Sequence, residues 1–473
     1  MAFEIGVLAD YIKVQGGFAY KSQDFQNSGT NKVLKIKNVR FGHVDYNDTA
    51  FISDKLAQAT FEWSTKEGDL LISMTGSGPN APQSLVGRIA RVWAGEDTAW
   101  INQRVGRIVL KEQGSIHPDF IFYLLSQQSS QDFLVANSSG SANQANISGK
   151  TIEMLPCPLV GYEESAKIAS ILLSLDKKIQ LNRQINQTLE QMAEALFKSW
   201  FVDFDPVVDN ALDAGFFEQD LAFSDELLQR AEARKALRVS SAYLEHHKPL
   251  PEAIRQLFPA AFEECAEPTL GLGGWVPVGW AVSITGDELT VKGGSTPSTA
   301  NHEFWDGGDI HWTSPKDLSG KAEKILLDTE RKITKEGLRK ITSGLLPAET
   351  VLMSSRAPVG YLALSKIPVA INQGYIAITE TKSLTQEYAL YWLDSKVEMI
   401  KSISGGTTFA EISKKTFRTI PIIVPTSAVV TAFSETAGMK LSKISKNVEE
   451  ISSLCAIRDS LLPILISGEL EIR

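Results

Sequence analysis

The stretch IASILLSLDKKIQLNRQINQTLEQMAEAL, residues 168–196, places a regular series of apolar and amide side chains on one face of a long helix. Steps of three and four residues, with a single step of seven, separate Ile168, Leu172, Leu175, Ile179, Asn182, Asn186, Leu189 and Leu196. This heptad spacing is typical of the seam of a coiled coil. We therefore predict a long helix that packs against a second helix.

A second stretch of the same kind, FSETAGMKLSKISKNVEEISSLCAIRDSL, covers residues 433–461. Its seam consists of Ala437, Leu441, Ile444, Val448, Ile451, Cys455 and Leu462. Asn182 aligns with Asn447, so a polar residue recurs at the same level of both helices, where it can fix register at some cost in stability. Two unrelated amphipathic helices would also fit, but equal length and an equal polar position favour a mutual pair.

The regions before the two helices also match each other in order, which indicates an internal duplication. The motif pairs are Val14-Gln15-Gly16-Gly17 with Val291-Lys292-Gly293-Gly294, Ile101-Asn102-Gln103 with Ile371-Asn372-Gln373, Ile147-Ser148 with Ile412-Ser413, and Pro156 with Pro421. The offset falls from 277 to 265 along these pairs and then stays at 265 through Leu196 and Leu461. Duplication followed by changes in loop length explains this drift.

Each copy begins with strand-like runs rich in Val, Ile and Phe, separated by Gly, Asn, Ser and Pro turns, which indicates a mixed α/β domain. The predicted order is a globular domain at 1–160, a helix at 161–202, an acidic connector at 203–274, a second globular domain at 275–426 and a second helix at 427–473. We expect two short helices in the connector, around 224–238 and 251–265. The fold class is therefore α/β with an internal two-fold repeat.

The composition is that of an ordinary soluble protein, with 43% hydrophobic and 22% charged residues in 473. The net charge is −9, but residues 203–267 hold 14 acids against 6 bases, and the rest holds 42 against 41. Bulk charge therefore neither excludes nor favours DNA binding. Three scattered cysteines, no secretory signal and no run long enough to cross a bilayer indicate a reducing cytoplasm.

The sequence carries no recognisable catalytic motif. Ile147-Ser148-Gly149-Lys150-Thr151 has the end of a phosphate-binding loop, but position 144 is Gln where that loop needs glycine, and the second copy reads Ile412-Ser413-Lys414-Lys415-Thr416. Neither an Asn-Pro-Pro-Tyr run nor a dinucleotide-binding glycine motif occurs. The six histidines, at 43, 117, 246, 247, 302 and 311, lack the spacing of metal ligands. We expect no catalytic centre, cofactor or metal in this chain.

Three segments resemble the specificity subunits of type I restriction-modification enzymes. Leu196-Phe-Lys-Ser-Trp-Phe-Val-Asp-Phe-Asp-Pro206 is similar to the family's central conserved region, and Leu461-Leu-Pro-Ile-Leu-Ile-Ser-Gly-Glu-Leu470 to its C-terminal conserved stretch. Val276-Pro-Val-Gly-Trp280 resembles the entry to a second target-recognition domain. The resemblance extends over nearly the whole chain.

The resemblance implies two target-recognition domains that each read one half of a bipartite, asymmetric DNA site. It also implies that the two helices pack antiparallel and set the gap of unspecified base pairs. Two modification subunits would bind S-adenosylmethionine and methylate adenine, and restriction subunits would use ATP and Mg for translocation and cleavage. A helix over 163–199 would be about 55 Å long, more than one DNA turn of about 34 Å, as such a spacer requires.

Polar and basic residues of the predicted loops are our candidates for DNA contacts, since Arg and Lys suit guanine and Asn and Gln suit adenine. In the first domain these are Lys21, Gln23, Lys37, Asn38, Arg40, Thr75, Arg88, Asn102, Gln103 and Asn143. In the second they are Lys292, Ser295, Thr296, Ser314, Lys316, Arg356, Asn372, Gln373, Thr407 and Thr408. These residues also have structural interpretations. The repeated Asn-Gln can equally cap a strand, the Gly-Gly pairs can be required by the backbone conformation of a turn, and the Lys and Arg residues can be solvated surface charges.

Phe197, Trp200 and Phe201 end the first helix, where they can form either a core or a surface that docks partner subunits; the family resemblance favours docking. Two other functions remain as alternatives to DNA recognition. A free-standing methyltransferase–nuclease fusion would need the missing motifs and a longer chain. A coiled-coil scaffold would not need two globular domains.

Overall fold

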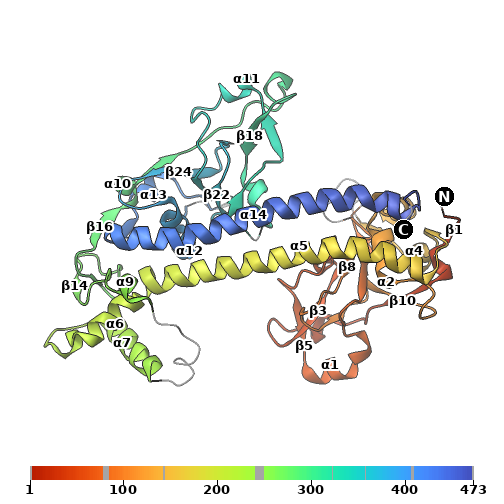
Figure 1. Cartoon of the computed structure of the whole chain (residues 1–473), viewed down its shortest axis with the longest axis horizontal. Helices are drawn as coiled ribbons and strands as arrows, with labels where there is room; N and C mark the ends of the chain where they lie inside the picture. The colour runs from red at the N-terminus through yellow and green to blue at the C-terminus, as the bar shows by residue number, and fades with distance from the viewer. Residues whose placement is uncertain are drawn as a thin grey trace. The chain divides into compact units, whose positions relative to one another are not determined.

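The computed structural model describes residues 3–77, 85–141, 144–239, 250–321, 323–356, 358–405 and 410–470 (Figure 1). The chain forms two compact units, Met1–Gln180 with Ile451–Arg473, and Leu181–Glu450. The first unit thus contains both ends of the chain, where the N–H of Phe3 donates to the carbonyl oxygen of Ser467 at 3.1 Å.

Among the described residues, the first unit is built on a five-stranded sheet and three smaller sheets. The five-stranded order is β2 (Ile12–Gly16), β10 (Val105–Leu110), β6 (Leu70–Ser73), β8 (Ile89–Arg91) and β4 (Gly42–His43), antiparallel except for the parallel pair β8–β4. A second sheet has the order β5 (Ala50–Ile52), β3 (Asn31–Leu34) and β9 (Ala99–Ile101), with β3 parallel to β9. β1 (Ile5–Val7) pairs with β13 (Pro156–Pro158).

The second unit repeats this topology strand for strand. Its five-stranded order is β17 (Leu289–Lys292), β24 (Tyr375–Thr381), β21 (Thr350–Ser354), β22 (Leu362–Ser365) and β19 (Ile325–Leu326), again with only the last pair parallel. Two smaller sheets also match those of the first unit. One has the order β20 (Arg331–Ile333), β18 (Ile310–Thr313) and β23 (Ala370–Ile371), and the other pairs β16 (Ala281–Ile284) with β25 (Pro421–Val424). The predicted internal duplication and the mixed α/β class are confirmed.

Short helices flank both sets of sheets. The first unit has α1 (Asp54–Ala59), α2 (Pro118–Ser126), α3 (Gln128–Ala136) and α4 (Gly149–Glu153), together with a small sheet of β11 (Ser139–Ser141), β12 (Gln144–Asn146) and β7 (Thr75–Gly76). The second has α10 (Thr285–Glu288), α11 (Lys335–Leu338), α12 (Gln386–Ser402) and α13 (Lys414–Arg418).

The repeated Ile-Ser motif marks the start of an equivalent helix in each unit. Ser148 precedes α4 and its Oγ accepts the N–H of Thr151 at 3.1 Å. Ser413 precedes α13 and accepts the N–H of Thr416 at 3.0 Å. Both serines therefore satisfy an N–H that a helix start leaves unpaired. The likeness of residues 147–151 to a phosphate-binding loop comes from this capping motif.

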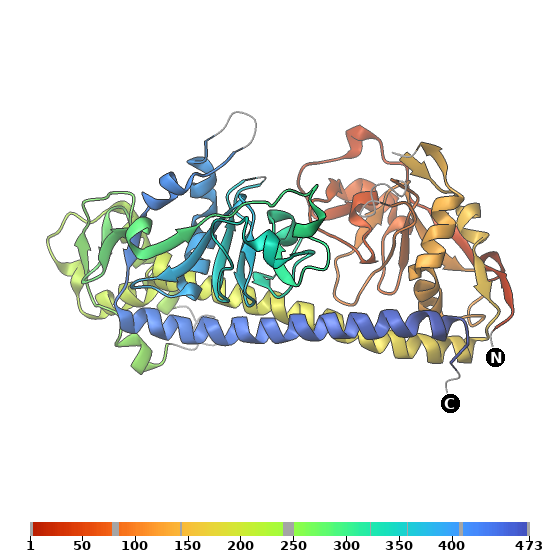
Figure 2. The same cartoon turned by 90° about the horizontal axis from the view of Figure 1, so that it is seen from above.

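The two long helices are α5 (Tyr162–Phe197) and α14 (Ser427–Ile466), and within each unit their segments lie side by side in antiparallel directions (Figure 2). In the second unit the Asn447 amide donates to Asn186 Oδ1 at 2.8 Å, and the Asn182 amide donates to Glu450 at 2.8 Å. In the first unit Arg458 donates to Asp176 at 2.8 Å. The prediction that the two helices pack against each other is confirmed. Asn447, however, faces Asn186, which lies four residues beyond its sequence counterpart Asn182.

The acidic connector is a folded part of the second unit, with α6 (Asp205–Asp213), α7 (Asp225–Arg238), α9 (Glu252–Arg255) and the pair β14 (Phe262–Glu264) with β15 (Trp275–Pro277). Three aspartates of α6 pair in register with three arginines of α7. Arg230 Nε lies 2.9 Å from Asp205, Arg234 Nε 3.0 Å from Asp209, and Arg238 2.5 Å from Asp213. Because both series advance by four residues, this charge ladder holds the two helices together.

Candidate nucleic-acid interface

Four segments that are far apart in sequence meet at the ends of the strands on one side of the five-stranded sheet in the first unit. β2 and β6 end there and β10 begins there, because β10 is antiparallel to both. The N–H of Met74 donates to Arg104 at 2.9 Å, and the N–H of Ile147 donates to Met74 at 3.0 Å. We call the segments 16–17, 74–75, 102–104 and 146–149 the strand-end cluster of the first unit.

The second unit forms the same network from equivalent residues. The N–H of Ser355 donates to Gly374 at 2.8 Å, and the N–H of Ile412 donates to Ser355 at 3.0 Å. The corresponding segments, 293–296, 355–356, 372–374 and 411–414, are the strand-end cluster of the second unit. Since these contacts use only backbone groups, they tolerate different side chains in the two copies.

The second glycine of each Gly-Gly pair is required by the close approach of the Ile-Asn-Gln turn. A Cβ on Gly17 would lie 2.5 Å from the carbonyl carbon of Asn102, and a Cβ on Gly294 would lie 2.5 Å from that of Ile371. The first glycines differ, because a Cβ on Gly16 would meet nothing within 4 Å, whereas Gly293 lies under the side chain of Lys414. Turn packing therefore explains Gly17 and Gly294.

Several predicted contact residues meet at these clusters with exposed side chains. Gln103 and Gln373 lie at the tips of the two repeated turns, and Thr296 donates to Gln373 Oε1 at 2.8 Å. Lys292 is also exposed, at the end of β17, and Arg356 lies 3.9 Å from Glu411 in an ion pair at the surface. Asn102 and Asn372 are half-buried, and each uses its Oδ1 to accept a backbone N–H of its own turn at 2.8 Å.

Three predicted contact residues are instead buried structural groups. The Asn38 side chain is 1% exposed and donates to Asp45 at 2.9 Å, which closes the turn after β3. Thr75 is buried and donates to Asn146 at 2.8 Å. Arg88 is 3% exposed and donates to three backbone carbonyls, those of Ile36, Val39 and Leu85, at 2.7–2.8 Å. Their polar atoms hold loops in place and are not exposed at the surface of the unit.

Burial acts on the charge of Arg88 as well. Loss of solvent, with a smaller contribution from the nearby Arg40, lowers the pKa of Arg88 to about 10. The guanidinium is still protonated at neutral pH, and its three carbonyl partners compensate for its burial. Its hydrogen bonds to Ile36 and Val39 hold in place the segment that contains Lys37 and Arg40.

The remaining candidates, apart from Ser295, lie outside the strand-end clusters or outside the described residues. Lys37 pairs with Asp48 at 2.5 Å, Arg40 with Asp45 at 3.4 Å, and Lys316 with Glu330 at 2.9 Å. Ser295, within its cluster, donates to Lys340, and Ser314 donates to Asp317. Lys21 and Gln23 are exposed on a short turn of helix at 22–24. Asn143, Thr407 and Thr408 fall outside the residues that the structure describes.

The structure adds two basic residues that the sequence analysis did not select. Arg104 is exposed and immediately follows the repeated Asn-Gln, and Lys414 is exposed across Gly293. Their adjacency to repeated motifs was a usable signal for both.

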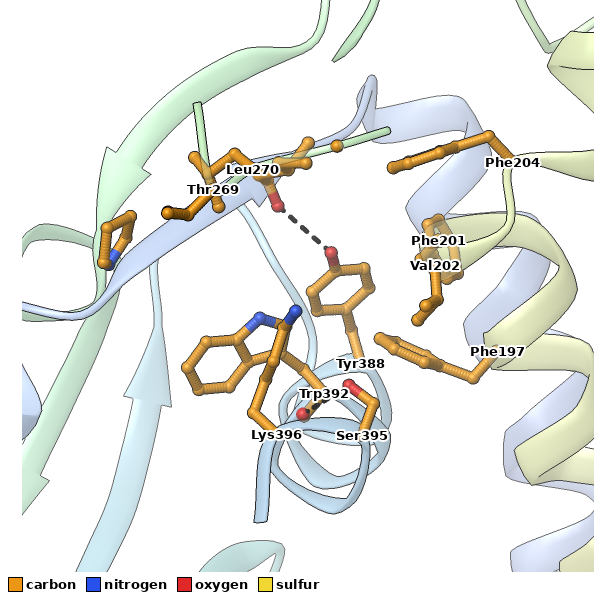
Figure 3. A pocket seen from close by; sticks show the side chains of 13 residues that line it. Phe197, Phe201, Val202, Phe204, Thr269, Leu270, Tyr388, Trp392, Ser395 and Lys396 are labelled. Atoms are coloured by element: carbon orange, nitrogen blue, oxygen red, sulfur yellow. Dashed lines mark hydrogen bonds between the residues drawn. The ribbon is translucent and has the colours of Figure 1, made fainter. Parts of the chain in front are cut away.

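The three aromatic residues predicted to dock partners are buried in the core of the second unit. Phe197, Trp200 and Phe201 are 2%, 3% and 7% exposed. The Phe201 ring lies 4.9 Å from Tyr388, and Phe197 lies beside the same tyrosine (Figure 3). Phe433 also packs against both phenylalanines, with its ring 5.2 Å from that of Phe201. Their rings therefore do not form an exposed docking surface. They join the end of α5 to α12 and α14. Phe197 and Phe201 also line a cavity of about 50 Å³.

Among the described residues, no three His, Cys, Asp or Glu side chains are grouped so as to hold a metal ion. No helix within the same residues is long and apolar enough to cross a membrane.

The chain thus contains two mixed α/β domains of one topology, each with a polar strand-end cluster and each packed within its unit against segments of the two long helices. The sequence matches the family described as type I restriction modification DNA specificity domain over residues 2–191 and 277–429. The chain therefore belongs to that family, and its role is DNA recognition in a type I restriction-modification system.

Individual relatives agree with this assignment. The chain is 28% identical over 459 residues to the type I restriction enzyme HindI specificity subunit of Haemophilus influenzae, which covers 96% of this chain and 95% of that protein. It is 39% identical over 154 residues to the MjaIX specificity subunit of Methanocaldococcus jannaschii, over 32% and 35% of the two chains. The fold is similar to that of the type I S subunit from M. genitalium, with a TM-score of 0.52 and 14% identity over 100% and 97% of the chains.

Proposed function

We propose that each globular domain reads one half of a bipartite, asymmetric DNA site through its strand-end cluster, and that α5 and α14 set the gap between the halves. One observation carries the proposal: the two clusters share a backbone network but differ in the placement of basic side chains. Three equivalent pairs are Arg104 and Gly374, Thr75 and Arg356, and Gly149 and Lys414. In each pair one copy has an Arg or Lys where the other has none.

This exchange has a direct consequence for recognition. An Arg or Lys in the major groove favours guanine, and its removal changes the preferred base at one position only. Two clusters on the same scaffold, with Arg or Lys side chains at different positions, would therefore read different DNA sequences. That supports an asymmetric site, because identical clusters would read two identical halves.

Mapping of methylated adenines tests the proposal in cells that express the chain with modification subunits of its system. We expect one bipartite motif with a fixed gap. Arg104→Ala should relax one half of the motif and Lys414→Ala the other, each by about 5- to 150-fold in base discrimination. Lys55→Ala, in the exposed face of α1 outside the clusters, is the matched control and should change neither half. A continuous motif, or relaxation of both halves by one variant, would contradict the proposal.

The partners that we propose are two modification subunits, one bound on each spacer helix, with restriction subunits joining that complex. Met192 of α5 is 51% exposed and Ile457 of α14 is 48% exposed. These two residues are equivalent in the duplication, at the constant offset of 265. Equivalent exposed apolar residues are suited to two copies of one partner.

Measurement of the mass of the assembled complex tests this stoichiometry. Met192→Asp should reduce the number of bound modification subunits from two to one, and Ile457→Asp should do the same. The double variant should bind none. Met439→Asp is the control, because Met439 is 68% exposed on α14 while its repeat counterpart, Ser174, is polar. An unchanged mass for both single variants would contradict the assignment of these positions.

Catalysis and cofactor binding belong to the partners in this proposal. S-adenosylmethionine would bind the modification subunits, and ATP with Mg the restriction subunits. The lack of methyltransferase and nucleotide-binding motifs in the sequence supports this division. Titration calorimetry of the isolated chain with S-adenosylmethionine should give no binding heat, and saturable binding would overturn the division.

A further inference from the structure

A tyrosine at the same place in each globular domain donates a hydrogen bond to a buried carboxylate of α5. In the first unit Tyr123 of α2 is 1% exposed, and its hydroxyl donates to Asp176 Oδ2 at 2.7 Å. Arg458 of α14 donates to the other oxygen, Asp176 Oδ1, at 2.8 Å. One carboxylate thus ties the globular domain to both long helices within this unit.

The second unit has a comparable arrangement around Glu190. Tyr391 of α12 is 1% exposed, and its hydroxyl donates to Glu190 Oε2 at 3.3 Å. The backbone N–H of Lys324 donates to Glu190 Oε1 at 3.1 Å, and the Lys324 ammonium lies 3.8 Å from Oε2. Asp394 and Glu194 also pair with that ammonium, so the buried cation does not depend on Glu190 alone.

The two tyrosines are equivalent in the duplication, but their carboxylate partners are not. Tyr123 and Tyr391 occupy the same position of the helix that follows the repeated Asn-Gln turn. The counterpart of Asp176 at the offset of 265 is Leu441, and that of Glu190 is Cys455. Duplication of an ancestral pair therefore does not account for both hydrogen bonds. Each domain meets an acid that arose at a separate position of the same helix.

Asp176 and Glu190 are separated by 14 residues, which is two heptads. They occupy the same heptad position, immediately after the seam residues Leu175 and Leu189. A helix residue recurs on the same side of a coiled coil after each heptad. Both acids are therefore placed on one side of α5 relative to its seam.

The other contacts of these tyrosine-bearing helices are mainly apolar. Phe120 and Leu124 of α2 share a core with Ile168 and Leu172 of α5. Apolar burial depends on area and has no preferred direction, so it permits small rotations of a domain on a helix. A buried hydroxyl–carboxylate hydrogen bond has a narrow range of distance and angle, and loss of its geometry leaves a buried polar group unsatisfied.

We infer that Tyr123 and Tyr391 are positioning residues that fix the angle at which each reading domain meets α5, and thereby restrict the enzyme to one gap length. The inference rests on the proposed function, because a gap exists only for a bipartite site. The two hydroxyl–carboxylate contacts, together with the helix length, would make the enzyme accept DNA with the correct gap and reject longer or shorter gaps. We call this selectivity gap discrimination. Neither hydroxyl is assigned any contact with DNA.

The test uses the chain assembled with its modification subunits and a set of DNA duplexes. These carry the two half-sites of the wild-type motif, separated by the wild-type gap or by one base pair more or less. Tyr391→Phe and Tyr123→Phe each remove a single oxygen. We expect each variant to lose at least about tenfold of the discrimination between the correct and altered gaps, with the half-site sequences unchanged.

Two other tyrosines supply matched controls. Tyr20 is buried and shares a hydrogen bond with Thr60 at 2.9 Å inside the first domain, and Tyr375 does so with Thr313 at 3.1 Å inside the second. Tyr20→Phe and Tyr375→Phe also remove one buried hydroxyl, but not one bound to α5. Both should keep wild-type gap discrimination, which separates positioning from general loss of stability.

If Tyr391→Phe does not fold, the double variant Tyr391→Phe with Glu190→Leu replaces the polar pair by an apolar pair and is expected to lose the same discrimination. Discrimination within twofold of wild type in the folded Phe variants, or in this double variant, would overturn the inference. Equal losses in the two control variants would also overturn it. A wild-type complex that methylates no bipartite site would instead contradict the proposed function itself.

Discussion

Substitution of the adjacent glycines Gly16 and Gly17 separates a packing role from a role in DNA contact. A Cβ on Gly17 would lie 2.5 Å from the carbonyl carbon of Asn102, whereas distances below 3.0 Å are essentially never seen. The turn must therefore move by at least about 0.5 Å. Such a shift strains the hydrogen bond from Phe18 to Ile101, now 3.0 Å. Gly16 is the internal control, because its Cβ would meet nothing within 4 Å.

The cost of Gly17→Ala follows from two contributions. Forced insertion of a methyl group into a packed site costs about 1–3 kcal/mol, and a disturbed backbone hydrogen bond about 0.5–1.5 kcal/mol. We expect destabilisation by about 2–4 kcal/mol, and a fall in melting temperature of about 10 °C for a unit of about 200 residues. Gly16→Ala should stay within about 0.5 kcal/mol of wild type.

Urea unfolding followed by circular dichroism, with DNA binding measured on the folded variants, checks this expectation. Equal destabilisation by both substitutions would refute the packing argument. So would a Gly17→Ala variant of wild-type stability that binds DNA poorly, because that result would indicate close phosphate approach. Gly294→Ala should repeat the effect in the second unit, where the nearest carbonyl belongs to Ile371.

Three further outcomes follow from the fold. Matched removal of one heptad from each long helix, residues 178–184 and 449–455, shortens the spacer by about 10 Å, so methylation mapping should show a gap about three base pairs shorter; an unchanged gap would contradict the spacer role. Arg88→Lys places one nitrogen where the guanidinium presents three, so it leaves buried carbonyls without a donor and should destabilise the first unit by about 2–4 kcal/mol in urea unfolding; a variant of wild-type stability would contradict the structural role of Arg88. Burial, with a smaller contribution from Asp10, raises the pKa of Cys157 to about 12. Iodoacetamide at pH 8 should therefore label the half-buried Cys265 and Cys455 but not Cys157, and mass spectrometry measures the labelling.

The duplication and the long helices were predictable because each leaves a periodic or repeated signal in the sequence. Gly17 with Gly294, and Ser148 with Ser413, recur because the backbone geometry of both domains needs them. The pairing of Asn447 with Asn186 was not predictable from the alignment of Asn447 with Asn182. In an antiparallel pair the facing residues depend on where the helices begin and on the fold that joins them, and heptad spacing records neither.

Depth of burial was the other quantity that the sequence could not supply. Arg88 and Asn38 have the side chains of base-reading residues, yet both are buried and bind backbone carbonyls. Trp200 and Phe201 have the composition of a docking surface, yet their rings belong to a core. Residue type is the same in each interpretation, and only the surrounding chain decides between them.

In the function that we propose, the strand-end clusters allow a duplicated scaffold to read two different sequences. Their segments are held by backbone hydrogen bonds from Met74 and Ser355, which do not depend on the side chains presented to solvent. A change from the exposed Lys414 to the glycine found at 149 therefore leaves the frame in place while it removes a charge. Recognition can then diverge by single substitutions, and stability remains with the buried groups, such as Arg88, that those substitutions do not touch.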